Sequence, residues 1–105
     1  MHAGRVISFG EALIDRLGPP GGDPSCDLPI TDCFGGAPAN VACALSRLGT
    51  NVSFIGSLGN DAFGEKFKNL LIHRGIDTSG LQQDTLRPTR VVLVRRDLNG
   101  ERFFE

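Results

Sequence analysis

The stretch Cys33–Gly49, CFGGAPANVACALSRLG, carries the strongest structural signal in the chain. Two adjacent glycines, Gly35 and Gly36, let the backbone turn tightly and approach a ligand without an intervening side chain. Pro38 suits the first turn of a helix, where its missing N–H costs nothing. Free N–H groups at such a helix start favour an oxygen-rich ligand. Asn40, in the same turn, can both donate a hydrogen bond to it and accept one.

The residues behind this bend have helical spacing. Val41, Leu45 and Leu48 recur on one face of a helix, and Gly49 follows as a C-terminal cap. We therefore expect this face to pack against the core.

An acidic residue follows the first predicted strand. Arg5–Phe9, RVISF, is short, apolar and rich in β-branched residues, which predicts a buried strand. Because ligands gather outside the carboxyl ends of parallel strands, Asp15 is a candidate hydrogen-bond acceptor for a ligand. The alternative is an Asp15–Arg16 ion pair on a solvated loop, and the spacing alone favours that alternative.

The rest of the chain reads as alternating strands and helices. Gly18–Pro29 is rich in proline and glycine and predicts a long irregular connection. Asn51–Leu58 alternates as a core strand, and Asp61 is a suitable N-cap for a helix that runs through Arg74. Two successive strand–helix units predict a parallel sheet with flanking helices, an α/β fold. The short segment Ile30–Phe34 is a further candidate strand.

A polar hairpin is expected at the end of the sequence. Thr89–Arg96 and Glu101–Phe104 flank Asn99-Gly100, a pair typical of a type I′ turn. Charged residues crowd this turn, so we expect the hairpin to project from the core.

Composition excludes several classes of function. A net charge of −1 over 105 residues gives no electrostatic footprint for nucleic acid or an anionic membrane. The cysteines Cys26, Cys33 and Cys43 lack the spacing of a disulfide framework or a zinc site, which favours reduced thiols. The chain shows no apolar run long enough for a signal peptide or a membrane span, so we expect a cytoplasmic protein.

Two other motifs are set aside. Gly59–Lys66 nearly fits a phosphate-binding loop, but Glu65 stands where the lysine is needed, and a carboxylate there would repel a triphosphate. His2 and His73 lie far apart in sequence and outside any metal-ligand spacing, so no metal ligand is predicted.

Several linked segments together resemble the N-terminal part of the ribokinase-like (PfkB) sugar kinases, from Arg5 to Glu105. The form GGAPANVA is most similar to the fructokinase branch. The segments that carry this resemblance are Gly10–Asp15, Gly35–Asn40, Gly56–Gly64 and Arg74–Asp77. The resemblance implies transfer of the ATP γ-phosphoryl group to a sugar hydroxyl, with magnesium as a further cofactor.

The resemblance also assigns roles. Asp15 would hydrogen-bond sugar hydroxyls, while Gly35, Gly36 and Asn40 would hold the sugar at the helix start. Residues 16–34 and 89–105 would form a lid that closes over the substrate. Fructose is the first expectation, with 2-keto-3-deoxygluconate, ribose and a nucleoside left open. A homodimer joined through the lid is a further expectation, and no nucleic-acid or membrane partner is expected.

The second signature of this family, which supplies the catalytic base and a glycine-rich anion hole, does not occur in these residues. The resemblance therefore implies that residues 1–105 are the sugar-binding N-terminal part of a kinase, without its C-terminal catalytic and ATP-binding part, and inactive alone. The alternative is a truncated, non-catalytic remnant that binds a sugar or a partner through the lid.

Overall fold

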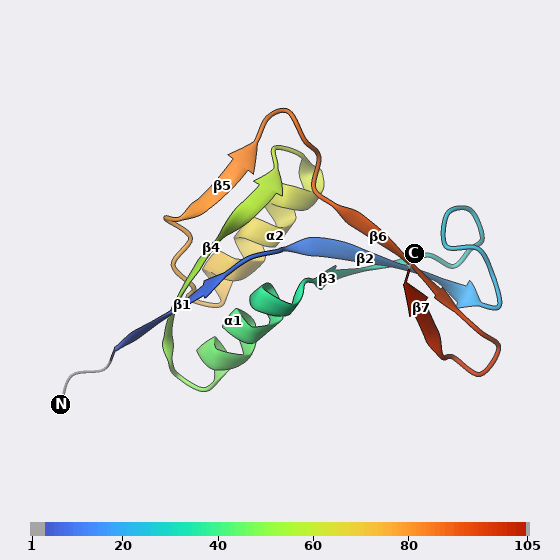
Figure 1. The fold of residues 1–105 in the computed structure, drawn as a ribbon, viewed down its shortest axis with the longest axis horizontal. Coiled ribbons are helices and arrows are strands. Elements are labelled where there is room, and N and C mark those ends of the chain that lie inside the picture. The colour runs from blue at the N-terminus through green and yellow to red at the C-terminus, as the bar shows by residue number, and fades with distance from the viewer. Residues whose placement is uncertain (1–3, 105) are drawn as a thin grey trace.

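The computed structural model describes residues 4–104 and shows two β-sheets and two helices (Figure 1). The Cα radius of gyration is 15.3 Å, whereas about 13 Å is typical of a compact chain of this length, because one sheet projects beyond the other. In chain order the elements are β1 (Arg5–Phe9), β2 (Leu13–Pro20), β3 (Thr31–Gly35), α1 (Ala37–Arg47), β4 (Asn51–Gly59), α2 (Ala62–His73), β5 (Leu81–Asp84), β6 (Val91–Arg96) and β7 (Arg102–Phe104).

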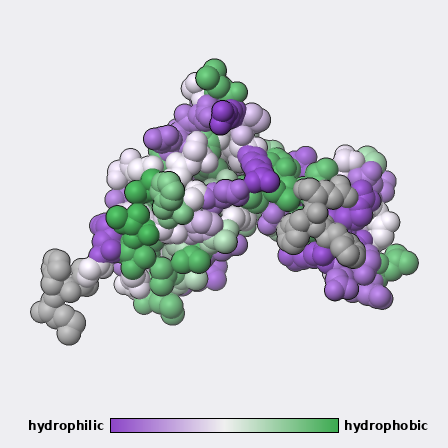
Figure 2. All heavy atoms as spheres, in the orientation of Figure 1, coloured by the Kyte–Doolittle hydropathy of each residue, from purple (hydrophilic) through white to green (hydrophobic). Residues whose placement is uncertain are grey.

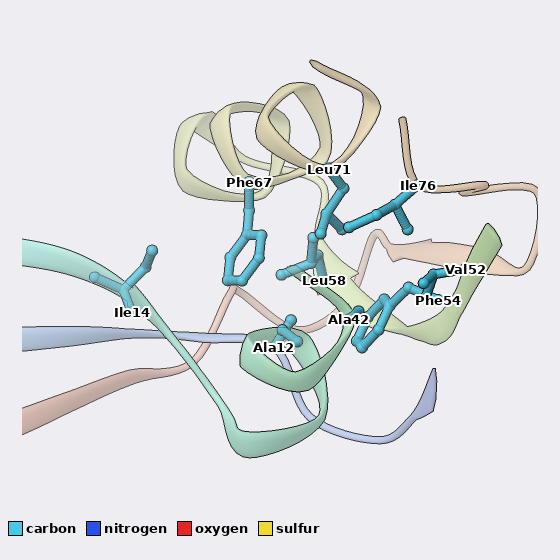
Figure 3. Packing of buried hydrophobic residues seen from close by; sticks show 10 residues of the cluster. Ala12, Ile14, Ala42, Val52, Phe54, Leu58, Phe67, Leu71 and Ile76 are labelled. Carbon is cyan, nitrogen blue, oxygen red and sulfur yellow. The ribbon is translucent and has the colours of Figure 1, made fainter. Parts of the chain in front are cut away.

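The first sheet is parallel, in the order β1-β4-β5, as the alternation of strands and helices predicts. Both helices pack on one face of it, over Val52, Phe54 and Leu58 of β4 (Figure 3). Phe67 and Leu71 of α2 close the core from above, and all five side chains are almost completely buried. The predicted alternation of Asn51–Leu58 is therefore confirmed. Strand β5 was not predicted, because LQQD has no apolar periodicity.

The opposite face of this sheet carries exposed apolar residues. Ile7 of β1 is 61% exposed and Phe9 is 76% exposed. The prediction of a strand at Arg5–Phe9 is confirmed, but the prediction that it is buried is wrong. β1 lies at the edge of the sheet, and among residues 4–104 both helices cover the other face. Figure 2 shows hydrophobic side chains gathered on the part of the molecule that holds β1 and α1.

Helix α1 packs with a face that only partly overlaps the predicted one. Its buried residues are Ala39 and Ala42, whereas Val41 is 51% and Leu48 81% exposed. Small alanines let the helix approach β1 and β4 closely, and Leu45 is partly buried against the core as predicted. The predicted end is confirmed, because Gly49 has φ +83° and its N–H donates to the Ser46 carbonyl.

The second sheet is mixed, in the order β3-β2-β6-β7, and extends away from the first (Figure 1). The strand β2 was not predicted, and it absorbs the first residues of the expected irregular connection. An Asp15–Arg16 pair on a loop is wrong, because both residues lie within β2 and neighbouring strand residues point to opposite faces. Arg16 instead pairs with Asp32 of β3 at 2.8 Å.

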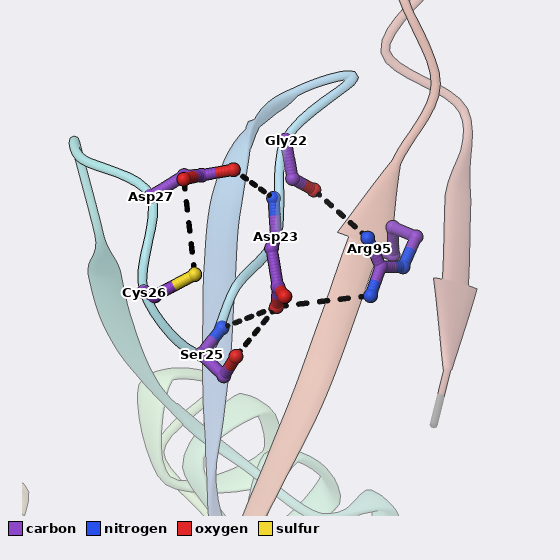
Figure 4. A network of polar contacts seen from close by, with 6 residues as sticks. All are labelled: Gly22, Asp23, Ser25, Cys26, Asp27 and Arg95. Carbon is purple, nitrogen blue, oxygen red and sulfur yellow. Dashed lines mark hydrogen bonds and ion pairs between the residues drawn. The ribbon is translucent and has the colours of Figure 1, made fainter.

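The connection from β2 to β3 is tied down by polar contacts (Figure 4). The Asp23 carboxylate accepts hydrogen bonds from the N–H and the hydroxyl of Ser25, which lower the pKa of Asp23. Asp27 accepts from the Asp23 N–H at 2.7 Å. Arg95 of β6 reaches this segment and donates to the Gly22 carbonyl. The irregular segment is therefore fastened to the central strands of the second sheet.

The hairpin of β6 and β7 is confirmed, but its turn differs from the predicted type. Gly100 has φ +84°, and no residue other than glycine has a positive φ among the described residues, so Asn99 does not take the conformation that type I′ requires. The Gly100 N–H donates to the Asp97 carbonyl, as in a type I turn followed by a glycine bulge. The Asp97 carboxylate accepts from the N–H groups of Asn99 and Glu101, which favours this arrangement.

One carboxylate joins the two sheets. Asp61 caps α2 as predicted, accepting from the Gly64 N–H at 2.8 Å. It also accepts from the N–H and the hydroxyl of Thr89, both at 2.7 Å, and Thr89 precedes β6. The Thr89 hydroxyl in turn accepts from the Gly59 N–H at the end of β4. These hydrogen bonds favour the ionised carboxylate and lower the pKa of Asp61.

Two phenylalanines give opposite expectations for the same substitution. Phe54→Ala empties a fully buried site and should cost about 3–5 kcal/mol of unfolding free energy. Phe9→Ala removes a largely exposed ring and should change it by less than about 0.5 kcal/mol. Urea unfolding of both variants measures the two values. A loss at Phe9 as large as that at Phe54 would show that its ring is buried in solution.

Asp61 should make stability pH-dependent. Its folded pKa lies below its unfolded value near 3.9, so its contribution is complete above that value and is lost as the pH falls through the folded pKa. Asp61→Ala should cost about 2 kcal/mol at pH 7, because a cap and two bonds to Thr89 are lost. Urea unfolding at successive pH values should show wild type and variant converging below pH 4. Curves that stay equally far apart at low pH would contradict this account.

Candidate functional site

The predicted glycine bend lies where β3 meets α1. Gly36 is the N-cap of the helix with φ +99°, a conformation that side chains rarely adopt. A side chain at Gly35 would collide with the carboxylate of Asp15. Asp15 reaches this position from β2, where it is paired with Cys33 of β3. The structure thus brings Asp15 together with Gly35, although 20 positions separate them.

Asn40 lies one turn into α1, and its N–H donates to the Gly36 carbonyl. Its side chain is exposed and lines a furrow between the two helices together with Arg47 and Arg74. Asp15 is not among the residues that line this furrow. The structure therefore places Asn40 near the glycine bend in sequence, but does not show its side chain sharing a cavity with Asp15.

An open cleft of about 340 Å³ lies at the carboxyl ends of the parallel strands. Such sheet ends are the usual ligand sites of α/β folds. The cleft adjoins the glycine bend, because a side chain on Gly36 would meet the Glu11 carbonyl at 2.5 Å. Its lining residues come from the connection after β1, the ends of β4 and β5, and the connection that leads into β6. They are Gly10, Glu11, Ala12, Ser57, Leu58, Gly59, Asp84, Arg87, Pro88, Thr89 and Arg90.

Charged residues on the rim of this cleft were missed by the sequence analysis. Arg90 Nη1 lies 2.7 Å from Glu11 Oε1, which joins the end of β1 to the start of β6. Glu11 had a usable signal, because it follows the first strand as closely as Asp15 does. No sequence pattern indicated Arg90, because nothing in the sequence places the start of the hairpin beside β1.

The start of α2 does not fit a nucleotide phosphate. The Asp61 carboxylate already accepts from the Gly64 N–H, and its negative charge would repel an anion there. This agrees with setting aside Gly59–Lys66 as a phosphate loop. Residues 4–104 contain no group of three or more potential metal ligands, and no helix among them is long and apolar enough to cross a membrane.

Comparison with known proteins places the chain. Residues 3–105 match the family model described as pfkB family carbohydrate kinase. The chain belongs to this family. It is 42% identical to fructokinase-1 of Zea mays over 107 residues, covering 99% of this chain and 33% of the relative. It is 40% identical to the fructokinase of Escherichia coli, covering 95% of this chain and 31% of the relative.

Solved structures agree with the sequence comparison. A fructokinase from Xylella fastidiosa has a TM-score of 0.83 at 40% identity, covering 96% of this chain and 32% of that one. A structure of that fructokinase with bound ATP has a TM-score of 0.80. The chain thus spans about a third of the length of its relatives, and the expected partial ribokinase-like α/β fold is confirmed.

The contact between Gly35 and Asp15 can be tested by a double-mutant cycle. Gly35→Ala should cost about 1–3 kcal/mol of stability in the wild-type chain and clearly less in an Asp15→Ala background, where the collision is relieved. Gly49→Ala is the matched control, because open space surrounds Gly49 and only its positive φ opposes a side chain. The cost at Gly49 should be the same in both backgrounds. Equal losses of stability for Gly35→Ala in both backgrounds would show that Asp15 does not contact the bend.

Proposed function

We propose that this chain is the sugar-binding third of a fructokinase-like kinase, which transfers the γ-phosphoryl group of ATP to a hydroxyl of fructose. The observation that carries the proposal is the similarity to fructokinases at about 40% identity along almost the whole chain. The Asp15 carboxylate at the glycine bend supports it, because a neutral polyol requires hydrogen-bond acceptors beside free N–H donors.

In this proposal Asp15 accepts hydrogen bonds from sugar hydroxyls, and the bend at Gly35 and Gly36 lets the sugar approach the start of α1. Asn40 joins them if its exposed side chain turns from the furrow toward the bend. The projecting sheet, with residues 16–34 and 89–105, acts as the lid that excludes water, which would otherwise accept the phosphoryl group.

ATP and Mg²⁺ serve the complete enzyme and bind outside these residues. The catalytic base and the anion hole belong to the remaining two thirds of the kinase domain. Since phosphoryl transfer depends on positioning and on charge stabilisation, the 105 residues alone bind sugar without turning it over. The protein acts in the cytoplasm.

Complementation tests this proposal. The 105-residue chain is co-expressed with the portion of Escherichia coli fructokinase that lies beyond the matched third. Fructose-dependent ADP release should require both parts, and Asp15→Ala should lower it at least about 100-fold, the loss of roughly 2.7 kcal/mol of transition-state stabilisation. The rate is measured with a coupled ADP assay.

The matched control is Glu65→Ala, which removes an exposed carboxylate on α2, outside the proposed lid and the glycine bend, and should leave the rate unchanged. Turnover by the 105 residues alone would refute the proposed inactivity. A co-purifying pair that phosphorylates no sugar would refute the kinase assignment.

A further inference from the structure

The Glu11–Arg90 ion pair lies on the rim of the cleft at the carboxyl ends of the parallel strands. A contribution to folding stability does not explain why it is there. Its side chains are 66% (Arg90) and 57% (Glu11) exposed. Ion pairs this exposed contribute little to folding, because water screens the attraction and long side chains must be ordered. Yet the pair bridges two connections 79 residues apart, at the mouth of a cleft where α/β proteins bind ligands.

The pair keeps hydrogen-bonding capacity for a ligand. Arg90 Nη1 meets Glu11 Oε1, which leaves other guanidinium N–H groups and the second carboxylate oxygen without a partner among residues 4–104. A sugar hydroxyl is both donor and acceptor, so neighbouring hydroxyls can donate to Glu11 while accepting from Arg90. The guanidinium of Arg90 also orients the Glu11 carboxylate that it contacts.

The charge on the rim selects the class of sugar. Glu11 and Asp84 balance Arg87 and Arg90, so the cleft carries no excess charge. The Asp84 carboxylate accepts from the N–H groups of Leu86 and Arg87 through Oδ1 alone, whereas the Glu11 carboxylate is paired with a guanidinium on the rim of the cleft. A sugar acid would bring its own carboxylate toward Glu11 and compete with it for Arg90, whereas a neutral sugar would not.

We propose that Glu11 and Arg90 form a specificity-determining pair that binds adjacent hydroxyls of a neutral sugar and rejects sugar acids. This inference rests on the proposed function and narrows its substrate class. It favours fructose over 2-keto-3-deoxygluconate, which the sequence left open.

The test is a titration of the ¹⁵N-labelled 105-residue chain, followed by amide chemical shifts, with fructose and with gluconate as the two probes. Fructose should shift the amides of residues 10–12 and of Arg87, Thr89 and Arg90, and gluconate should not. Glu11→Gln should weaken fructose binding about tenfold, through loss of one charged hydrogen bond, and should give gluconate measurable binding. Arg90→Gln should weaken fructose similarly without that gain.

Asp77→Asn is the matched control. It changes the net charge as Glu11→Gln does and alters the exposed Arg5–Asp77 pair, which joins the amino end of β1 to the connection after α2. Its sugar preference should equal that of the wild type. If fructose binds without shifting these amides, or if Glu11→Gln leaves the preference unchanged, the pair is not the selector while the proposed function stands. If no sugar binds, both are overturned.

Discussion

The position of the second sheet depends on the hydrogen bonds between Asp61 and Thr89. One carboxylate caps α2 and also holds the residue that precedes β6, so the start of the projecting sheet is fixed to the end of the parallel one. The glycines around it are required by space, because side chains at Gly59 and Gly64 would collide with Thr89 and with the Gly59 carbonyl. The segment Gly59–Lys66, which resembles a phosphate-binding loop in sequence, therefore connects the two sheets in this structure.

The parallel sheet is covered on one face only within residues 4–104. Parallel sheets in proteins are generally buried on both faces, and here the free face carries Ile7 and Phe9 at an open edge strand. Relatives three times as long supply enough additional chain to cover it. Additional chain that completes the core would explain both the exposed apolar residues and the fact that the chain spans only about a third of its relatives' length.

The sequence predicted those parts of the fold that local chemistry determines. Asp61 as a cap, Gly49 after α1 and the alternation of β4 all follow from patterns within a few residues. The errors fall where partners distant in sequence decide. Val41 was expected to be buried, but Ala39 and Ala42 face the sheet because only small residues permit the close approach of α1. Arg5–Phe9 was expected to be buried because a local pattern cannot show which side of a strand remains uncovered. Asp15 was identified beside the glycine bend by resemblance, while Arg90 required the topology.

The two parts of the candidate site, the glycine bend and the Glu11–Arg90 pair, have different roles in the proposal. In the proposed site, the bend at Gly35 and Gly36 would offer backbone N–H groups beside the Asp15 carboxylate, a combination that suits many polyols and discriminates weakly among them. Discrimination requires a group that an incorrect ligand would leave unpaired or would repel. Glu11, held by Arg90, is such a group, because it accepts from a hydroxyl but repels a carboxylate.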